Sequence, residues 1–334
     1  MKKVKTKKKF KIWIIMRNIS LTIVAALLIL IVLNNAMTAY EQKKYPAIGQ
    51  LVEVDGNNMH VYTKGDGENT IVLLSGLGTD APVLDFEPLI NEMLKNNKIV
   101  VVELFGYGWS DLTNKERTVE NIVEEIRTAL KESNIEGPYI LMPHSISGIY
   151  SMYYANKYPD EVRAVIGIDP TLPGFNHHSS HTMPKVSDSH EMPKFYVAPT
   201  GIVRLASFLI PDLFFPIAEE ETYSEENLKM TKAISVWNSF NKNVANETNN
   251  IHHNIDKTID MTFPSVIPVM IFTPKEENIN EDDQSKITFY QTQLSNGSSN
   301  KLVTLEGNHY LHWTRYKEIS EHVNKFIETH VSDK

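Results

Sequence analysis

The sequence has 334 residues, 42% of them apolar, which is enough for one large domain or two small ones. Its formal net charge of −8 is uneven, because residues 1–17 carry seven lysines and one arginine, or +8, so that the rest carries −8 − 8 = −16. The acidic remainder excludes the clustered basic face of a nucleic-acid-binding protein, and the lack of cysteine excludes disulfides, thiol nucleophiles and thiolate metal sites.

The chain opens with a basic tail, residues 1–17, followed by an uncharged stretch, residues 18–40. A helix of that length reaches about 35 Å, enough to cross a bilayer core of about 30 Å. Lysines on its N-terminal side hold that end in the cytoplasm, so the rest of the chain should lie outside a single-pass cell-membrane anchor. A signal peptide cut after Ala36-Met37-Thr38 is the alternative. The anchor is favoured because the apolar core, 19–33, is long for a signal peptide.

A polar linker containing Pro46, residues 41–50, precedes alternating strand and helix patterns. Residues 50–65 read as a hairpin. Continuous apolar runs read as buried parallel strands at 70–76, 98–106, 137–144, 164–169, 265–273 and 301–307. Helical patterns fall at 83–97, 118–133 with Thr118 as N-cap, 147–159 and the C-terminus. Strands separated by helices predict an α/β fold with a mostly parallel sheet covered on both sides.

One interval, 172–262, lacks a clear buried strand and divides this core into residues 51–171 and 263–334. It is too long for a plain loop, so it predicts a helical lid. The apolar run 202–215 could lie on a membrane, but Pro211 and Asp212 interrupt it, which favours a lid helix facing the pocket.

Histidines in this interval could suggest zinc, namely His177, His178, His181 and His190. No carboxylate pattern at helical spacing accompanies them. A polar lid loop and no metal are therefore expected.

Chemistry-bearing residues follow three of the predicted strands. In such a sheet, reactive groups gather at the carboxyl ends of strands. Ser145 follows one strand end, Gly76 lies at another and His309 follows the last. A carboxylate should follow a strand between the serine and the histidine, and both Glu277 and Asp169 satisfy this condition.

Four motifs in the same order carry a family resemblance. They are "VVELFGYGWSD", "RTVENIVEEI", "GPYILMPHSISGIYSMYYANKYPDEVRAVIGID" and "LEGNHYLHW". The chain resembles the α/β-hydrolase fold family, of the single-domain esterase and lipase type with a lid, and its bacterial subgroup with an N-terminal membrane helix. The likeness covers residues 45–171 and 263–334 and is poor in the inserted interval.

The resemblance implies a serine hydrolase that cleaves an ester or similar acyl bond of a small-molecule substrate through an acyl-enzyme, with no cofactor. Ser145 would be the nucleophile and His309 the general base and acid. Glu277 would be the triad acid because it has the family's usual position, with Asp169 as the alternative.

The oxyanion hole would come from two backbone N–H groups, those of Leu77 and Ile146. Gly76 and His144 would line the substrate pocket. Ser75 stands where the family often has histidine, which should matter little because the donor is backbone.

The frame around Ser145 departs from G-x-S-x-G, since Pro143 and Ser147 replace the two glycines. Both side chains are compact enough for a sharp turn. The departure also supports an alternative function, a catalytically silent α/β-hydrolase-fold protein that binds a small ligand or partner. Covalent labelling of Ser145 separates the two. The sequence predicts no oligomeric state.

Overall fold

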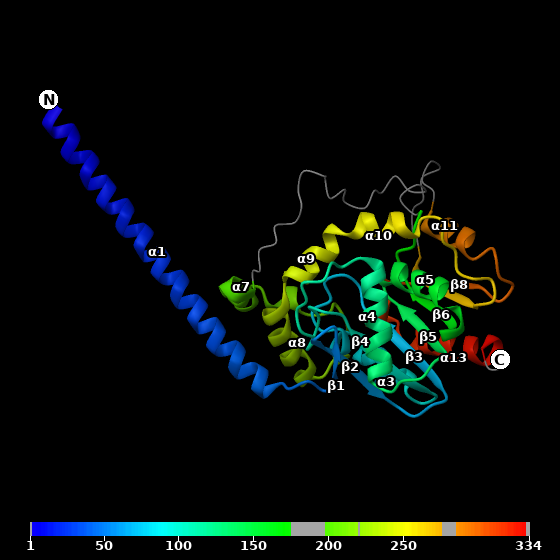
Figure 1. Ribbon diagram of the computed structural model, residues 1–334. Helices are drawn as coiled ribbons and strands as arrows, with labels where there is room; N and C mark the ends of the chain where they lie inside the picture. Colours follow the sequence, from blue (N-terminus) through cyan, green and yellow to red (C-terminus); the bar gives the residue numbers. More distant parts are fainter. Residues whose placement is uncertain (1, 175–197, 220, 276–284, 332–334) are drawn as a thin grey trace.

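The computed structural model describes residues 2–174, 198–219, 221–275 and 285–331 (Figure 1). An eight-stranded sheet lies at its centre, in the order β1-β2-β4-β3-β5-β6-β7-β8. Strands β1 and β2 are antiparallel to their neighbours, and all other pairs are parallel. The strands are β1 (Gln50–Val54), β2 (Asn57–Lys64), β3 (Asn69–Leu74), β4 (Asn97–Glu103), β5 (Tyr139–Pro143), β6 (Val162–Ile168), β7 (Val269–Pro274) and β8 (Lys301–Leu305). The predicted fold class is confirmed.

Helices cover both faces of the sheet. The alternating strand residues divide into two apolar clusters, one packed under α4 and α5 and the other under α3 and α13. The helices of the core are α2 (Pro82–Asp85), α3 (Glu87–Met93), α4 (Val119–Glu132), α5 (Ser147–Lys157), η1 (Pro159–Glu161), α11 (Lys286–Gln293), α12 (Leu311–Thr314) and α13 (Tyr316–His330). Burial on both faces explains why the parallel strands read as continuous apolar runs.

Two local predictions about turns and caps are confirmed. The hairpin turns at Asp55 and Gly56, which both have positive φ, at 51° and 77°. This is the conformation that a two-residue hairpin turn of the commonest type requires. Thr118 caps α4, because its side chain accepts a hydrogen bond from the Asn121 N–H.

The helix predicted over 83–97 is interrupted. The structure has two short helices, α2 and α3, with Phe86 between them at φ −85° and ψ 1°. Pro88 is the cause, since it has no N–H to continue the ladder and its ring crowds the preceding turn.

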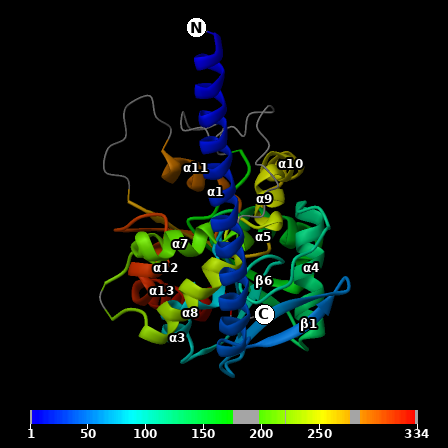
Figure 2. The ribbon, with the colours of Figure 1, turned by 90° about the vertical axis from the view of Figure 1, so that its left-hand side faces the viewer.

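The N-terminal helix α1 (Lys2–Lys44) is longer than the predicted 18–40 (Figures 1 and 2). It continues into the basic tail and the linker because lysine, glutamate and glutamine favour helix and no glycine or proline occurs before Pro46. Its part from Phe10 to Lys44 is long and apolar enough to cross a membrane. Its end is also tied to the domain, since Glu41 accepts hydrogen bonds from Arg204 and Trp237.

The interval between β6 and β7 is helical where it is described. It contains η2 (Ala198–Thr200), α7 (Ile202–Leu209), η3 (Pro211–Phe214), α8 (Glu225–Asn238), α9 (Lys242–Asn249) and α10 (Ile251–Thr258). Side chains of this interval form hydrogen bonds with loops at the carboxyl ends of strands. Asn241 Nδ2 donates to Gly106 O at 2.7 Å, and Asn238 Nδ2 donates to Gly108 O at 2.6 Å. The histidine cluster that begins at His177 lies outside the described residues.

Candidate active site

Ser145 lies on a sharp turn between β5 and α5. Its φ is +53°, a left-handed conformation that a serine adopts only when the surrounding structure imposes it. The turn is held by Ser145 O, which accepts from the N–H groups of Gly148 at 2.9 Å and Thr171 at 2.7 Å. A strained serine between a buried strand and a helix is the backbone arrangement of a nucleophile elbow.

The residues that replace the two glycines fit this turn. Pro143 ends β5 and still pairs in register with Leu74. Ser147 is fully buried, and its hydroxyl donates to Ser75 O at 2.5 Å. The tight approach falls one residue later, where a Cβ at Gly148 of α5 would lie 2.5 Å from Thr171 O in the loop after β6. Glycine is therefore required at 148 and serine is tolerated at 147.

The loop after β3 lies against the nucleophile. A Cβ on Gly76 would be 2.9 Å from His144 Nδ1 and 3.1 Å from Ser145 Cβ. Within the part of the chain that the structure describes, the N–H groups of Leu77 and Ile146 donate no hydrogen bond. Two unused donors beside a serine suit the charge that develops on a carbonyl oxygen during acyl transfer.

His309 and Asp169 meet at the same edge of the sheet. The His309 Nδ1–H donates to Asp169 Oδ2 at 2.6 Å, although the two residues are 140 positions apart in the chain. Asp169 follows β6 directly, at φ +42°, and is 2% exposed, whereas the His309 side chain is 38% exposed. The buried carboxylate thus orients the ring and leaves its other nitrogen, Nε2, facing away from the pair.

The Asp169 carboxylate has three further partners. Thr273 Oγ1 donates to Oδ1 at 2.9 Å, Lys286 Nζ lies 2.7 Å from Oδ2, and the Tyr290 hydroxyl lies 3.4 Å from Oδ1. Burial alone would raise the pKa of Asp169, but the His309 hydrogen bond and the Lys286 charge outweigh it and leave that pKa below its usual value. The group is therefore ionised at neutral pH.

Glu277 lies outside the described residues, so its predicted place beside His309 stays a prediction. The carboxylate that the described structure brings to His309 is Asp169. Among those same residues, no hydrogen bond joins the Ser145 hydroxyl to His309. Catalytic hydrogen bonds are often long before substrate binds.

His144 is a buried packing residue next to this pair. Its Nε2–H donates to the His309 backbone oxygen at 3.2 Å, and its ring lies 4.7 Å from the His309 ring. Burial, followed by the nearby charges of His312 and His309, holds the pKa of His144 well below its ordinary value. A neutral His144 can support the His309 loop without competing for protons. His312 is also buried and bonds to Asp85 at 2.7 Å.

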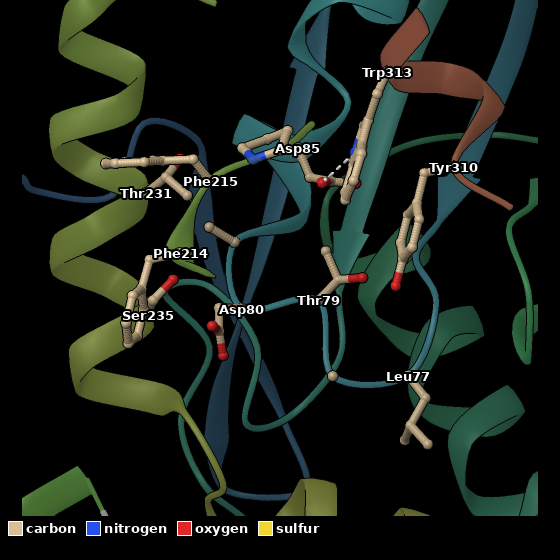
Figure 3. A pocket seen from close by; sticks show the side chains of 13 residues that line it. Leu77, Thr79, Asp80, Asp85, Phe214, Phe215, Thr231, Ser235, Tyr310 and Trp313 are labelled. Atoms are coloured by element: carbon tan, nitrogen blue, oxygen red, sulfur yellow. Dashed lines mark hydrogen bonds between the residues drawn. The ribbon is translucent and has the colours of Figure 1, made fainter. Parts of the chain in front are cut away.

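A pocket of about 180 Å³ lies between the loop after β3 and the histidine loop (Figure 3). Leu77 and Asp80 line it from the loop after β3. Tyr310 of the histidine loop and Trp313 of α12 line it from the other side, with their rings stacked at 4.0 Å. Burial raises the pKa of Asp80 to about 7, partly offset by hydrogen bonds from Ser235 and Ser239. Asp80 thus brings to the pocket wall a carboxyl group whose pKa lies well above the usual range of an aspartate.

A buried hydrogen-bond network ties the inserted helices to the loop after β3. Glu247 of α9 accepts from the hydroxyls of Tyr107 at 2.8 Å and Tyr150 at 2.7 Å. The Tyr107 oxygen in turn accepts from the Gly78 N–H at 3.1 Å. Sequence reasoning missed Glu247, Lys286 and Asp80, since no motif marks any of them.

Comparison with known proteins agrees with this architecture. The family model described as alpha/beta hydrolase fold matches residues 69–316. YbdG, an uncharacterized protein of Bacillus subtilis, is 34% identical over 226 residues, which cover 67% of each chain. The 2-(acetamidomethylene)succinate hydrolase of Mesorhizobium japonicum is 29% identical over 124 residues, 37% of this chain and 43% of that one.

Solved structures give the same fold at low identity. Cfl2 from Burkholderia cenocepacia is 16% identical, with a TM-score of 0.62, and the match covers 83% of this chain and 94% of that one. The epoxide hydrolase VrEH1 from Vigna radiata is 17% identical, with a TM-score of 0.61, over 84% of this chain and 97% of that one. At these identities the likeness concerns the fold alone. The family match over most of the chain shows that this protein belongs to the alpha/beta hydrolase fold family.

Proposed function

We propose that the protein is a serine hydrolase that cleaves an ester or similar acyl bond through a Ser145–His309–Asp169 triad. The observation that carries the proposal is the 2.6 Å pair of His309 with a buried, ionised Asp169, at the same sheet edge as a serine with positive φ on a strand-to-helix turn. A serine hydroxyl alone is a weak nucleophile. In this arrangement His309 can take its proton, and Asp169 can orient the His309 ring and stabilise the imidazolium.

The reaction follows from the positions of these groups. The Ser145 oxygen attacks the carbonyl carbon while His309 Nε2 takes the hydroxyl proton, and Asp169 stabilises the imidazolium. The N–H groups of Leu77 and Ile146 hold the oxyanion. The intermediate collapses, and the alcohol leaves with the proton from His309. Water, deprotonated by His309, then attacks the acyl-enzyme, and the carboxylic acid departs as Ser145 recovers its proton.

The relatives' names point to two reaction classes. One structural neighbour is an epoxide hydrolase, and one partial relative is named for hydrolysis of an acetamidomethylene compound. Epoxide hydrolases and dehalogenases of this fold use an aspartate nucleophile, whereas this chain has Ser145 at the turn. Acyl transfer is therefore the chemistry that the residues support.

A fluorophosphonate probe tests the proposal directly, because it reacts only with an activated serine. Purified full-length protein should gain one probe mass on Ser145. Ser145→Ala and His309→Ala should abolish labelling. Ser147→Ala is the matched control, since its hydroxyl is already committed to Ser75 O, and it should keep most of the label. Folded protein that takes up no probe would refute the hydrolase and leave the ligand-binding alternative.

We further propose that α1 anchors the protein in the cell membrane with its N-terminus in the cytoplasm and the hydrolase domain outside. The support is an apolar helix with exposed side chains along its length and a lysine-rich N-terminal side. The end of α1 is bonded to the domain through Glu41, so an uncleaved anchor would also hold the domain close to the bilayer.

The orientation can be measured because the chain has no cysteine. Val266→Cys places one thiol at a position whose native side chain is 66% exposed, in the turn before β7. A membrane-impermeant maleimide should label it in intact cells as fully as in lysed cells. Labelling that requires lysis would mean that the domain is cytoplasmic.

A further inference from the structure

Helix α7 presents a row of exposed apolar side chains beside the anchor helix. Ile202 is 51% exposed, Leu205 48% and Leu209 73%, at spacings that place them along one side of the helix. Ile210, next to them, is 52% exposed. Such a contiguous apolar surface marks a contact with another molecule or a membrane.

The contacts between α1 and α7 indicate what lies against this surface. A Cβ on Gly201, at the start of α7, would lie 2.8 Å from Leu30 Cγ of α1, and Asn34 Nδ2 donates to Ala198 O at 3.1 Å. Leu30 belongs to the last turn of the uninterrupted apolar core of α1, which ends at Leu33. Helix α7 therefore begins beside the outer half of the predicted anchor, just before Asn34 and Asn35 end its apolar core. Figures 1 and 2 show α7 next to α1 from two sides.

The charge on α7 is neutralised at this place. Arg204 is the one charged residue of the helix, and it is 6% exposed. Its guanidinium bonds to Glu41 at 2.6 and 2.8 Å, to Asn34 Oδ1 at 2.9 Å and to Thr38 Oγ1 at 3.0 Å. The outer side of α7 is thus left apolar, as in helices that lie in a membrane interface.

A pocket behind α7 connects this surface to the active-site loop. It has a volume of about 410 Å³, within the range of small-ligand sites, and its lining is mostly apolar. Ile202 and Phe240 line it and are also 51% and 60% exposed, so they form its rim. At the other end it shares Gly78, Asp80 and Phe214 with the pocket next to Leu77 and Tyr310.

We propose that α7 lies in the outer interface of the membrane that α1 crosses, and that the pocket behind it takes the acyl chain of a lipid-like ester drawn from that bilayer. The proposal rests on the proposed hydrolase function and names its substrate class. An acyl chain that enters between Ile202 and Phe240 would stay out of water from the bilayer to the loop that carries Leu77. Its carbonyl group would then be the part that reaches Ser145.

The docking of α7 is tested without any activity. Leu209→Cys and, as the matched control, Val266→Cys are labelled with a nitrobenzoxadiazole fluorophore in the full-length protein. The protein is then reconstituted in phosphatidylcholine–phosphatidylglycerol vesicles that contain doxyl-labelled lipid. Quenching at 209 should exceed quenching at 266 by about threefold or more, because a label on α7 would sit among the lipids. Equal quenching at the two positions would overturn the docking of α7.

The substrate class is tested with two esters of one fluorogenic alcohol, a water-soluble acetate and a vesicle-embedded oleate. Leu205→Glu combined with Leu209→Glu puts charges on the outer side of α7, at residues that do not line the pocket. The double variant should lose about tenfold of its kcat/KM for the oleate and keep its acetate activity, because charge is disfavoured at an apolar membrane contact. Val266→Glu should change neither.

The outcomes separate the two proposals. Unchanged oleate turnover in the double variant, or an equal loss for both esters, would overturn the bilayer route while the hydrolase stands. If the wild-type protein cleaves neither ester and takes up no fluorophosphonate, the hydrolase and the lipid substrate fall together. The quenching ratio then still decides whether α7 lies in the membrane.

Discussion

Asp169→Asn is expected to lower kcat for ester hydrolysis by about 10⁴-fold, the size of loss seen when the orienting carboxylate of a catalytic serine–histidine pair becomes an amide. The amide carries no charge, so it cannot stabilise the imidazolium that forms when His309 takes the Ser145 proton. Lys286, which lies 2.7 Å from the carboxylate, would then keep its positive charge near the ring without the anion that compensates it. Steady-state kinetics should show the loss in kcat with KM nearly unchanged, because Asp169 does not touch substrate.

Two further variants test whether Asp169, and not another residue near His309, is the acid of the triad. Glu277→Gln should retain turnover, because Asp169 already occupies the His309 Nδ1 position. Lys286→Met removes one partner of Asp169 but not the His309 bond, and its loss should be about tenfold or less, in line with a screened, partly exposed charge. Circular dichroism of each variant establishes folding. Full activity in Asp169→Asn together with a large loss in Glu277→Gln would reverse the assignment of the acid.

The sheet and the serine turn could be predicted from the sequence because their signals are local. Each of these signals lies within a few neighbouring residues: the continuous apolar strands, the Asp55-Gly56 turn and the small residues around Ser145. The structure also explains the Ser147 departure, which depends on its bond to Ser75 O. That bond joins residues 72 positions apart, so no pattern near Ser145 could reveal it.

The choice of acid could not be made from the sequence, since both candidates follow a strand. Pairing across the sheet brings Asp169, which directly follows β6, beside β7, where it meets Thr273 as well as His309. The bond between Arg204 and Glu41, 163 positions apart, is equally invisible in the sequence. Taken locally, the interrupted apolar run 202–215 favours a lid helix. Its position beside α1 depends on contacts between distant parts of the chain, which the run itself does not indicate.

Gly76→Ala is expected to lower kcat by about 10²- to 10³-fold, the cost of losing one oxyanion donor. The added Cβ would lie 2.9 Å from His144 Nδ1 and 3.1 Å from Ser145 Cβ, and the buried His144 cannot move aside. The loop must therefore shift outward and carry the Leu77 N–H away from the oxyanion. The fluorophosphonate labelling rate should fall with kcat, because the probe's phosphoryl oxygen uses the same donors.

A matched variant two residues on separates this effect from general damage to the loop. Gly78 has φ +75°, and a Cβ added there would meet no atom within 4 Å beyond its chain neighbours, so the space for a side chain is open. Asparagine tolerates that left-handed conformation, and Gly78→Asn keeps the N–H that donates to the Tyr107 hydroxyl. It should retain most of the wild-type kcat for the water-soluble acetate, which has no long acyl chain to fill the pocket that Gly78 lines. A Gly76→Ala protein that turns over at the wild-type rate would show that the Leu77 N–H is not an oxyanion donor, and the hole would then have to be built from Ile146 and a group elsewhere.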